Sequence, residues 1–228
     1  MTSAASERPE ERLVIEPRWP IAVALGFFIA VSIVLRIAVP ERSSLGPYWL
    51  IPAVEVGLLV LLLVADPARV GGHRRWLRRL AIALVSLLAC AALTSTVKLI
   101  VDLVEGTKVT ESASNLLASG ALIWLGNVLV FSLFYWLMDS GGPLARYLGE
   151  RPYPDFAFTQ QLSPELAPPG WRPTYVDYLI LGLTTSTAFS PTDVMPLTWW
   201  AKLTMALQSL ISLAVVGLVI ARAVNVFS

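Results

Sequence analysis

Cysteine and histidine are almost absent, with one of each, Cys90 and His73, among 228 residues. A disulfide framework needs paired cysteines, and a zinc site needs several Cys or His ligands. The sequence therefore predicts neither of these, and we expect no metal and no cofactor. Nucleophilic chemistry based on Ser–His or Cys–His pairs is equally disfavoured, and no glycine-rich phosphate loop is present. We expect a protein that is not an enzyme, with paired aspartate chemistry as the least favoured alternative.

Charge is also scarce. Charged residues make up 14% of the chain, against about a quarter in typical soluble domains, whereas 56% of the residues are hydrophobic. The net charge of +1 leaves no basic face for nucleic acid. Residues 1–19 mix glutamate with arginine and lack the apolar core of a signal peptide, so we interpret them as a polar tail. The composition predicts an integral membrane protein.

Long apolar runs set the expected fold. A hydrocarbon core about 30 Å thick needs roughly 20 apolar residues in a helix. A further apolar stretch, residues 176–189, is too short for a full span, so it is either a half-helix or a helix completed by extended backbone. We predict an all-α bundle of five full transmembrane helices plus one short or half helix. The five predicted spans cover residues 20–39, 48–65, 80–104, 116–138 and 197–226.

Orientation is predicted from one loop. Residues 66–79 hold five arginines, and cytoplasmic loops carry the excess of Lys and Arg. This places the N-terminus in the cytoplasm, and we expect a multi-pass protein of the cell (inner) membrane. We expect the lipid bilayer and further copies of the chain as partners, with no nucleic acid. Aromatic residues near the predicted span ends fit an interfacial belt; these are Trp19, Tyr48, Trp49, Trp76, Tyr135 and Trp136.

Four regions follow from this organisation. They are a polar tail (1–19), a four-helix transmembrane bundle (20–139), a connection (140–173) and a final region (174–228) that holds the short helix and the last span. The connection contains seven prolines, which block a long helix there.

Four ionisable residues lie inside the predicted spans: Arg36, Glu55, Lys98 and Asp102. Buried charge in a membrane is costly and marks functional candidates. All four fall in the outer half of the predicted bilayer and their charges cancel. A neutral cluster that fixes helix register is the favoured interpretation, and an ion or proton vestibule with Glu55 as the titrating group is the alternative.

Polar and small residues in the spans predict close helix packing. Asn127 in the fourth span and Gln208 in the last are expected to form hydrogen bonds between helices, each worth about 1 kcal/mol. Gly120 and Gly126 are expected to let another helix approach closely.

The most informative segment runs from Thr174 to Asp193. Thr174 and Asp177 have the spacing of a capping box, with Asp in place of Glu. Four hydroxyl residues in a row (184–187) are predicted to support an unwound stretch, because hydroxyls can bond to nearby backbone. The candidate pore or ion-path residues are Thr184, Thr185, Thr187, Ser190 and Asp193.

The order of these parts resembles a potassium-channel pore: a short helix, an extended Thr/Ser-rich piece, an acid and a spanning helix. The last fifty or so residues also resemble the C-terminal part of an uncharacterised family of bacterial polytopic membrane proteins. Residues 187–193 read Thr-Ala-Phe-Ser-Pro-Thr-Asp, so they lack the glycines with which a potassium filter points its carbonyls inward. Potassium selectivity is therefore not expected.

Topology separates the alternatives for this segment. Since the arginine loop places residues 140–173 in the cytoplasm, residues 176–190 either cross the membrane as a short sixth helix or dip in from the cytoplasm. The crossing is preferred, with Asp193 outside and Arg222 inside. The favoured function is a degenerate pore-loop protein that conducts or binds a cation without potassium selectivity. The alternative is a non-conducting helical scaffold or partner protein.

Overall fold

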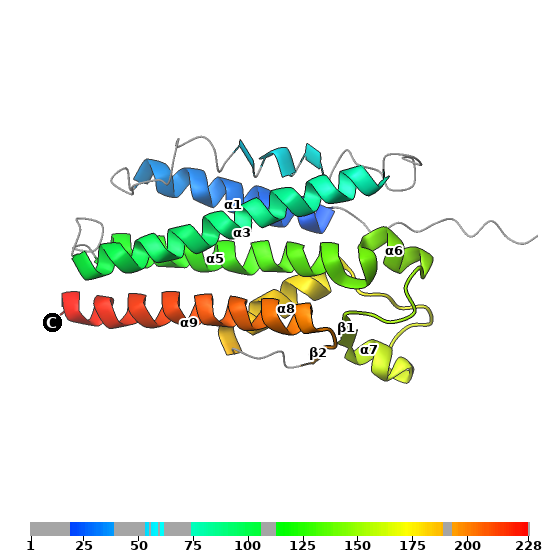
Figure 1. Ribbon diagram of the computed structural model, residues 1–228. Coiled ribbons are helices and arrows are strands. Elements are labelled where there is room, and N and C mark those ends of the chain that lie inside the picture. Colours follow the sequence, from blue (N-terminus) through cyan, green and yellow to red (C-terminus); the bar gives the residue numbers. More distant parts are fainter. Residues whose placement is uncertain are drawn as a thin grey trace, which may run out of the picture.

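The computed structural model describes residues 19–38, 53, 54, 56–58, 60, 61, 74–105, 113–188 and 193–227, and is mostly helical (Figure 1). The long helices are α1 (Trp19–Ala38), α3 (Arg74–Glu105), α5 (Ala113–Met138) and α9 (Trp199–Phe227), with a shorter α8 (Tyr175–Ala188). The segment between α5 and α8 forms η1 (Asp139–Gly141), α6 (Pro143–Leu148), strand β1 (Phe156–Phe158), α7 (Thr159–Leu162) and η2 (Pro164–Leu166). Strand β2 (Val194–Pro196) precedes α9.

Three stretches of the described helices are long and apolar enough to cross a membrane: Arg79–Val101, Ser114–Leu148 and Trp199–Ala221. A shorter apolar stretch, Trp19–Ala30, lies in α1. The prediction of a mostly helical protein with helices long and apolar enough to span a membrane is confirmed, whereas the count of five full spans is not. Most of the predicted second span, residues 48–65, lies outside the described residues.

Helix α5 is the centre of the bundle. It contacts α1, α3, α8 and α9, and 72% of its apolar window is buried, against 22% for α3 and 33% for α9. Helices α3 and α9 lie on either side of α5 and run in the opposite direction (Figure 1). Gly120 allows α9 to approach α5, because a Cβ there would lie 2.5 Å from Cγ2 of Val219. Gly126 likewise faces Phe28 of α1, so the predicted close packing at both glycines is confirmed.

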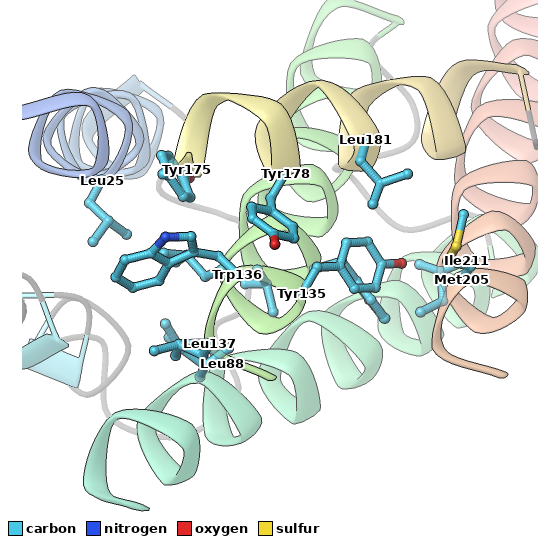
Figure 2. Close-up of a cluster of buried hydrophobic side chains, with 14 of the residues drawn as sticks. Leu25, Leu88, Tyr135, Trp136, Leu137, Tyr175, Tyr178, Leu181, Met205 and Ile211 are labelled. Carbon is cyan, nitrogen blue, oxygen red and sulfur yellow. The ribbon is translucent and has the colours of Figure 1, made fainter. Parts of the chain in front are cut away.

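Aromatic side chains fill the core at the end where α5 stops. Phe156 of β1 is fully buried, and its ring lies 5.1 Å from that of Tyr135 and 5.7 Å from that of Trp200. Figure 2 shows Tyr175, Tyr178 and Leu181 of α8 pointing toward Tyr135 and Trp136 of α5. These two α5 residues are 0% and 8% exposed, so their predicted place in an interfacial belt is wrong: β1 and α9 pack on Tyr135, and α8 packs on Trp136.

Of the other four predicted belt residues, two agree with the prediction and two are not described. Trp19 and Trp76 are mostly exposed, as residues of an interfacial belt should be. Tyr48 and Trp49 lie outside the described residues.

Pairing between the two strands fixes the position of α8 in the bundle. β1 and β2 pair antiparallel, with Ala157 opposite Met195, and the hydroxyl of Thr159 donates to the carbonyl oxygen of Asp193 at 2.8 Å. Both ends of the α8–β2 segment therefore lie at the end of the bundle where α5 stops, which we name the connection end. Helix α8 runs inward from it, and residues 193–196 are back at it (Figure 1).

The preferred crossing of residues 176–190 is therefore wrong: the chain returns to the end of the bundle from which α8 starts, and we call this path re-entrant. With 14 residues, α8 spans about 21 Å, which is shorter than a hydrocarbon core of about 30 Å. Asp193 and Lys202 lie at the connection end with the arginine-rich start of α3, whereas Arg222 lies toward the opposite end of α9. Asp193 thus lies at the same end of the bundle as the arginine-rich start of α3, and not at the opposite end as predicted, because strand pairing returns the chain to the end from which α8 starts.

Candidate functional site

The re-entrant helix begins at a cap that the sequence predicts. The backbone N–H of Thr174 donates to Oδ2 of Asp177 at 2.7 Å, which is one half of a capping box. The Thr174 hydroxyl donates to the same oxygen at 2.9 Å. In the first turn, burial raises the pKa of the Tyr175 hydroxyl above its usual value near 10, so this group is neutral at physiological pH.

The Thr/Ser run does not unwind α8. Helix α8 is continuous to Ala188, so the predicted extended stretch over residues 184–187 is wrong. Thr184 and Thr187 donate their hydroxyl protons to the carbonyls of Ile180 and Leu183, at 3.0 and 2.9 Å. A hydroxyl that bonds four residues back is satisfied inside a helix, and it therefore gives the backbone no reason to open.

The five candidate pore residues do not gather at one place. Thr187 is exposed on the outer side of α8, Thr184 is half-buried, and Thr185 is buried. Asp193 is exposed at the connection end, and Ser190 lies outside the described residues. The described members thus divide between an outward side of the re-entrant segment and its packed inward side.

The inward side of α8 approaches α5 at Gly182. A Cβ at this position would overlap Oγ of Ser132 and lie 3.0 Å from the carbonyl oxygen of Val128. Glycine is therefore required here by the distance between the two helices. The approach leaves no room for an ion between α5 and α8 at this level.

Gln208 of α9 joins three helices in the same layer. Its side chain is fully buried, its Oε1 accepts from the Tyr135 hydroxyl at 2.6 Å, and its Nε2 donates to the carbonyl of Gly182 and to Oγ of Ser186, each at 2.8 Å. Asn127 donates from Nδ2 to the Gln208 carbonyl at 3.3 Å. The predicted bonding of Asn127 and Gln208 between helices is confirmed.

Two serines of α9 extend this polar layer. The Ser212 hydroxyl donates to the carbonyl of Ser186 at 2.8 Å, and the Ser209 hydroxyl donates to that of Thr185 at 3.3 Å. Oδ1 of Asn127 and Oγ1 of Thr185 are buried and have no hydrogen-bond partner among the described residues. The polar groups facing the interior mainly hold α8 against α9.

Two buried aspartates that the sequence reading missed organise the connection end. Asp139 follows α5 directly and is fully buried. Its Oδ1 accepts from the backbone N–H of Asp155 at 2.8 Å and from that of Phe156 at 3.3 Å, and its Oδ2 accepts from the Tyr178 hydroxyl. Asp139 therefore ties the end of α5 to β1 and to α8.

Asp155 links the end of α5 to α9. Its Oδ2 accepts from the backbone N–H of Ser140 at 2.8 Å, and its Oδ1 accepts from Nε1 of Trp200 at 2.9 Å. Ser140 has φ of +52°, an uncommon conformation for a residue with a side chain. An acid directly after an apolar span, followed by Ser-Gly-Gly, is the signal that could have marked this site. Since donors occupy their oxygens, these carboxylates serve as structural acceptors.

Arg146 of α6 completes the cluster. One guanidinium nitrogen, Nη1, donates to the carbonyl of Trp136 in the last turn of α5 at 2.7 Å and to that of Asp139, the first residue of η1, at 2.9 Å. The guanidinium also lies 4.9 Å from the ring centre of Tyr178. The side chain thus caps α5 and packs on α8.

The predicted intramembrane charge cluster stays a prediction. Lys98 is half-buried in α3. Arg36 and Asp102 lie in α1 and α3, but their side chains fall outside what the structure describes, as does Glu55 altogether.

No group of three or more His, Cys, Asp or Glu side chains that could hold a metal ion occurs in the described part of the chain. Comparison with protein-family models, with curated proteins and with solved structures finds no match to this chain.

Proposed function

We propose that this protein is a polytopic inner-membrane protein whose re-entrant α8–β2 segment acts as a degenerate pore loop that conducts or binds a cation without potassium selectivity. The observation that carries the proposal is the path of the chain: α8 enters the bundle about two thirds as deep as a hydrocarbon core, and β2 is back at the end of entry. A short helix that enters the bundle, followed by a chain that returns to the face of entry, is the arrangement found in a pore loop. The proposal gives the protein no enzymatic activity.

The pathway would lie on the outward side of α8. On the inward side, Gly182 touches α5 and Gln208 occupies the space toward α9, so one chain offers no room for an ion there. Thr187 and Asp193 are exposed. We therefore place the pathway between copies of the chain in a homo-oligomer, where outward sides of α8 would face one another.

The orientation is part of the proposal. The arginine-rich start of α3 and Lys202 lie at the connection end, and cytoplasmic ends carry excess Lys and Arg. We place this end in the cytoplasm, so the pore loop would enter from the cytoplasmic side. In a Cys90→Ala background, Leu166→Cys and Met195→Cys should both be labelled by an impermeant thiol reagent from the cytoplasmic side. Labelling from opposite sides would contradict re-entry.

Ion flux through purified, reconstituted protein tests the function. We expect cation conductance that falls in Thr187→Val and Asp193→Asn. Thr204→Val is the matched control, because Thr204 in α9 makes the same bond to a carbonyl four residues back, at 2.9 Å, as Thr187 does in α8. A silent bilayer with an intact oligomer would refute the pore loop.

The second candidate is a non-conducting scaffold or partner protein. It is favoured by the way Asp139, Asp155 and Gln208 use their polar atoms to hold the re-entrant segment in place. For a scaffold, Thr187→Val and Asp193→Asn would change thermal stability alone, with no flux in any variant. The resemblance of the last fifty residues to uncharacterised bacterial membrane proteins fits both candidates.

A further inference from the structure

Four arginines begin α3, at positions 74, 75, 78 and 79. The first turn of this helix has no acidic residue. Positions 74 and 78, and likewise 75 and 79, are four apart, so residues of like charge recur about one helical turn apart. The positive end of the helix dipole lies at the same turn. Each of these arrangements is unfavourable for an isolated helix, so negative charge from outside α3 is needed to offset them.

The arginines lie where a membrane surface would be. The apolar span of α3 starts at Arg79, the last of the four. Trp76, between them, is 61% exposed, which is typical of an aromatic side chain at headgroup level. With 22% of its window buried, α3 has the most open surface of the three candidate spans. The described side chains at the start of α3, those of Trp76 and Arg79, are therefore exposed and not packed in the interior of the bundle.

Three acids of the connection end are already engaged elsewhere. Asp139 and Asp155 accept bonds from α8, α9 and the connection, and Asp177 caps α8. Guanidinium groups bind phosphate oxygens through paired hydrogen bonds. Basic clusters directly beside a membrane span attract anionic lipid headgroups.

We propose that residues 74–79 form a binding surface for anionic phospholipid headgroups in the leaflet at the connection end. The arginines bind the phosphates, and Trp76 sets the depth of the segment. This requires only insertion in a membrane and is independent of conduction.

Spin-labelled lipids test the proposal in reconstituted vesicles. Electron paramagnetic resonance measures how strongly labelled phosphatidylglycerol and phosphatidylcholine associate with the protein. We expect a several-fold preference for phosphatidylglycerol that weakens with added salt. Replacing all four arginines with glutamine should bring the preference near parity. A matched control, with Arg151, Arg172 and Lys202 changed to glutamine, should keep most of it.

Two results would overturn the proposal: no preference in the natural protein, or an unchanged preference in the four-arginine variant with its helical circular dichroism intact. If that variant fails to fold, Arg74→Gln with Arg75→Gln should still remove a measurable part of the preference, and no change would again refute the proposal. Full displacement of labelled phosphatidylglycerol by millimolar inorganic phosphate would assign the surface to free phosphate instead.

Discussion

Gly182→Ala tests whether the α5–α8 contact holds the re-entrant helix in place. The added Cβ would overlap Oγ of Ser132 and lie 3.0 Å from the Val128 carbonyl oxygen, so α8 must move or Ser132 must rotate. Overpacking of this kind costs about 1–3 kcal/mol. Alanine also stabilises a helix by about 0.5–1 kcal/mol relative to glycine. We expect a net loss of about 1 kcal/mol, and at most about 2.5 kcal/mol, in the free energy of unfolding.

The matched control is Gly217→Ala in α9. A Cβ at Gly217 meets nothing within 4 Å, so only the helix-propensity gain applies and the variant should be more stable by about 0.5–1 kcal/mol. The two glycine variants should therefore differ by about 1–3 kcal/mol. The measurement is unfolding in mixed micelles with increasing dodecyl sulfate, followed by circular dichroism.

A double variant identifies the clashing atom. Ser132→Ala removes Oγ at the cost of one hydrogen bond to the Val128 carbonyl, worth about 0.6 kcal/mol in a membrane protein. The double variant Ser132→Ala with Gly182→Ala should be more stable, by at least about 0.5 kcal/mol, than the summed losses of the two single variants predict. Equal stability of the Gly182 and Gly217 variants, or additive effects of Ser132 and Gly182, would refute the close approach.

Three further predictions concern the polar groups that hold α8. Gln208→Leu removes three side-chain hydrogen bonds at about 0.6 kcal/mol each, so the free energy of unfolding in mixed micelles should fall by about 2 kcal/mol. An unchanged free energy of unfolding would contradict the role of Gln208 in joining three helices. Asp139→Ala leaves buried N–H and O–H donors unpaired and should cost about 3 kcal/mol or more, with β1 exposed to proteolysis first. Because burial raises the pKa of Tyr175, its neutral form stabilises the fold below pH about 10, and this contribution is lost as pH rises above that value. Tyr175→Phe should flatten the alkaline decline in stability whereas Tyr153→Phe, on an exposed residue, should not, and equal pH profiles would argue against the burial of Tyr175.

The helices and several of their contacts could be read from the sequence because they depend on local signals. The apolar runs predicted α1, α5 and α9 to within three residues and α3 to within six, and Thr174 with Asp177 predicted the start of α8. Asn127 and Gln208 could be assigned to helix contacts because a polar amide in a span needs a partner. The unwinding at residues 184–187 was predicted wrongly, since hydroxyls bond equally well to the carbonyls of an intact helix.

The sequence by itself determined that this chain is helical and apolar enough for a membrane, because helix length and hydropathy are local properties. Only the tertiary structure decided that α8 turns back. That outcome depends on β1 pairing with β2, on Asp139 bonding to Tyr178 and on Asp155 bonding to Trp200, contacts between residues 36 to 45 positions apart. No periodicity or charge rule encodes such distant pairs. A short helix with one polar end is compatible with crossing and with returning until its strand partner is known.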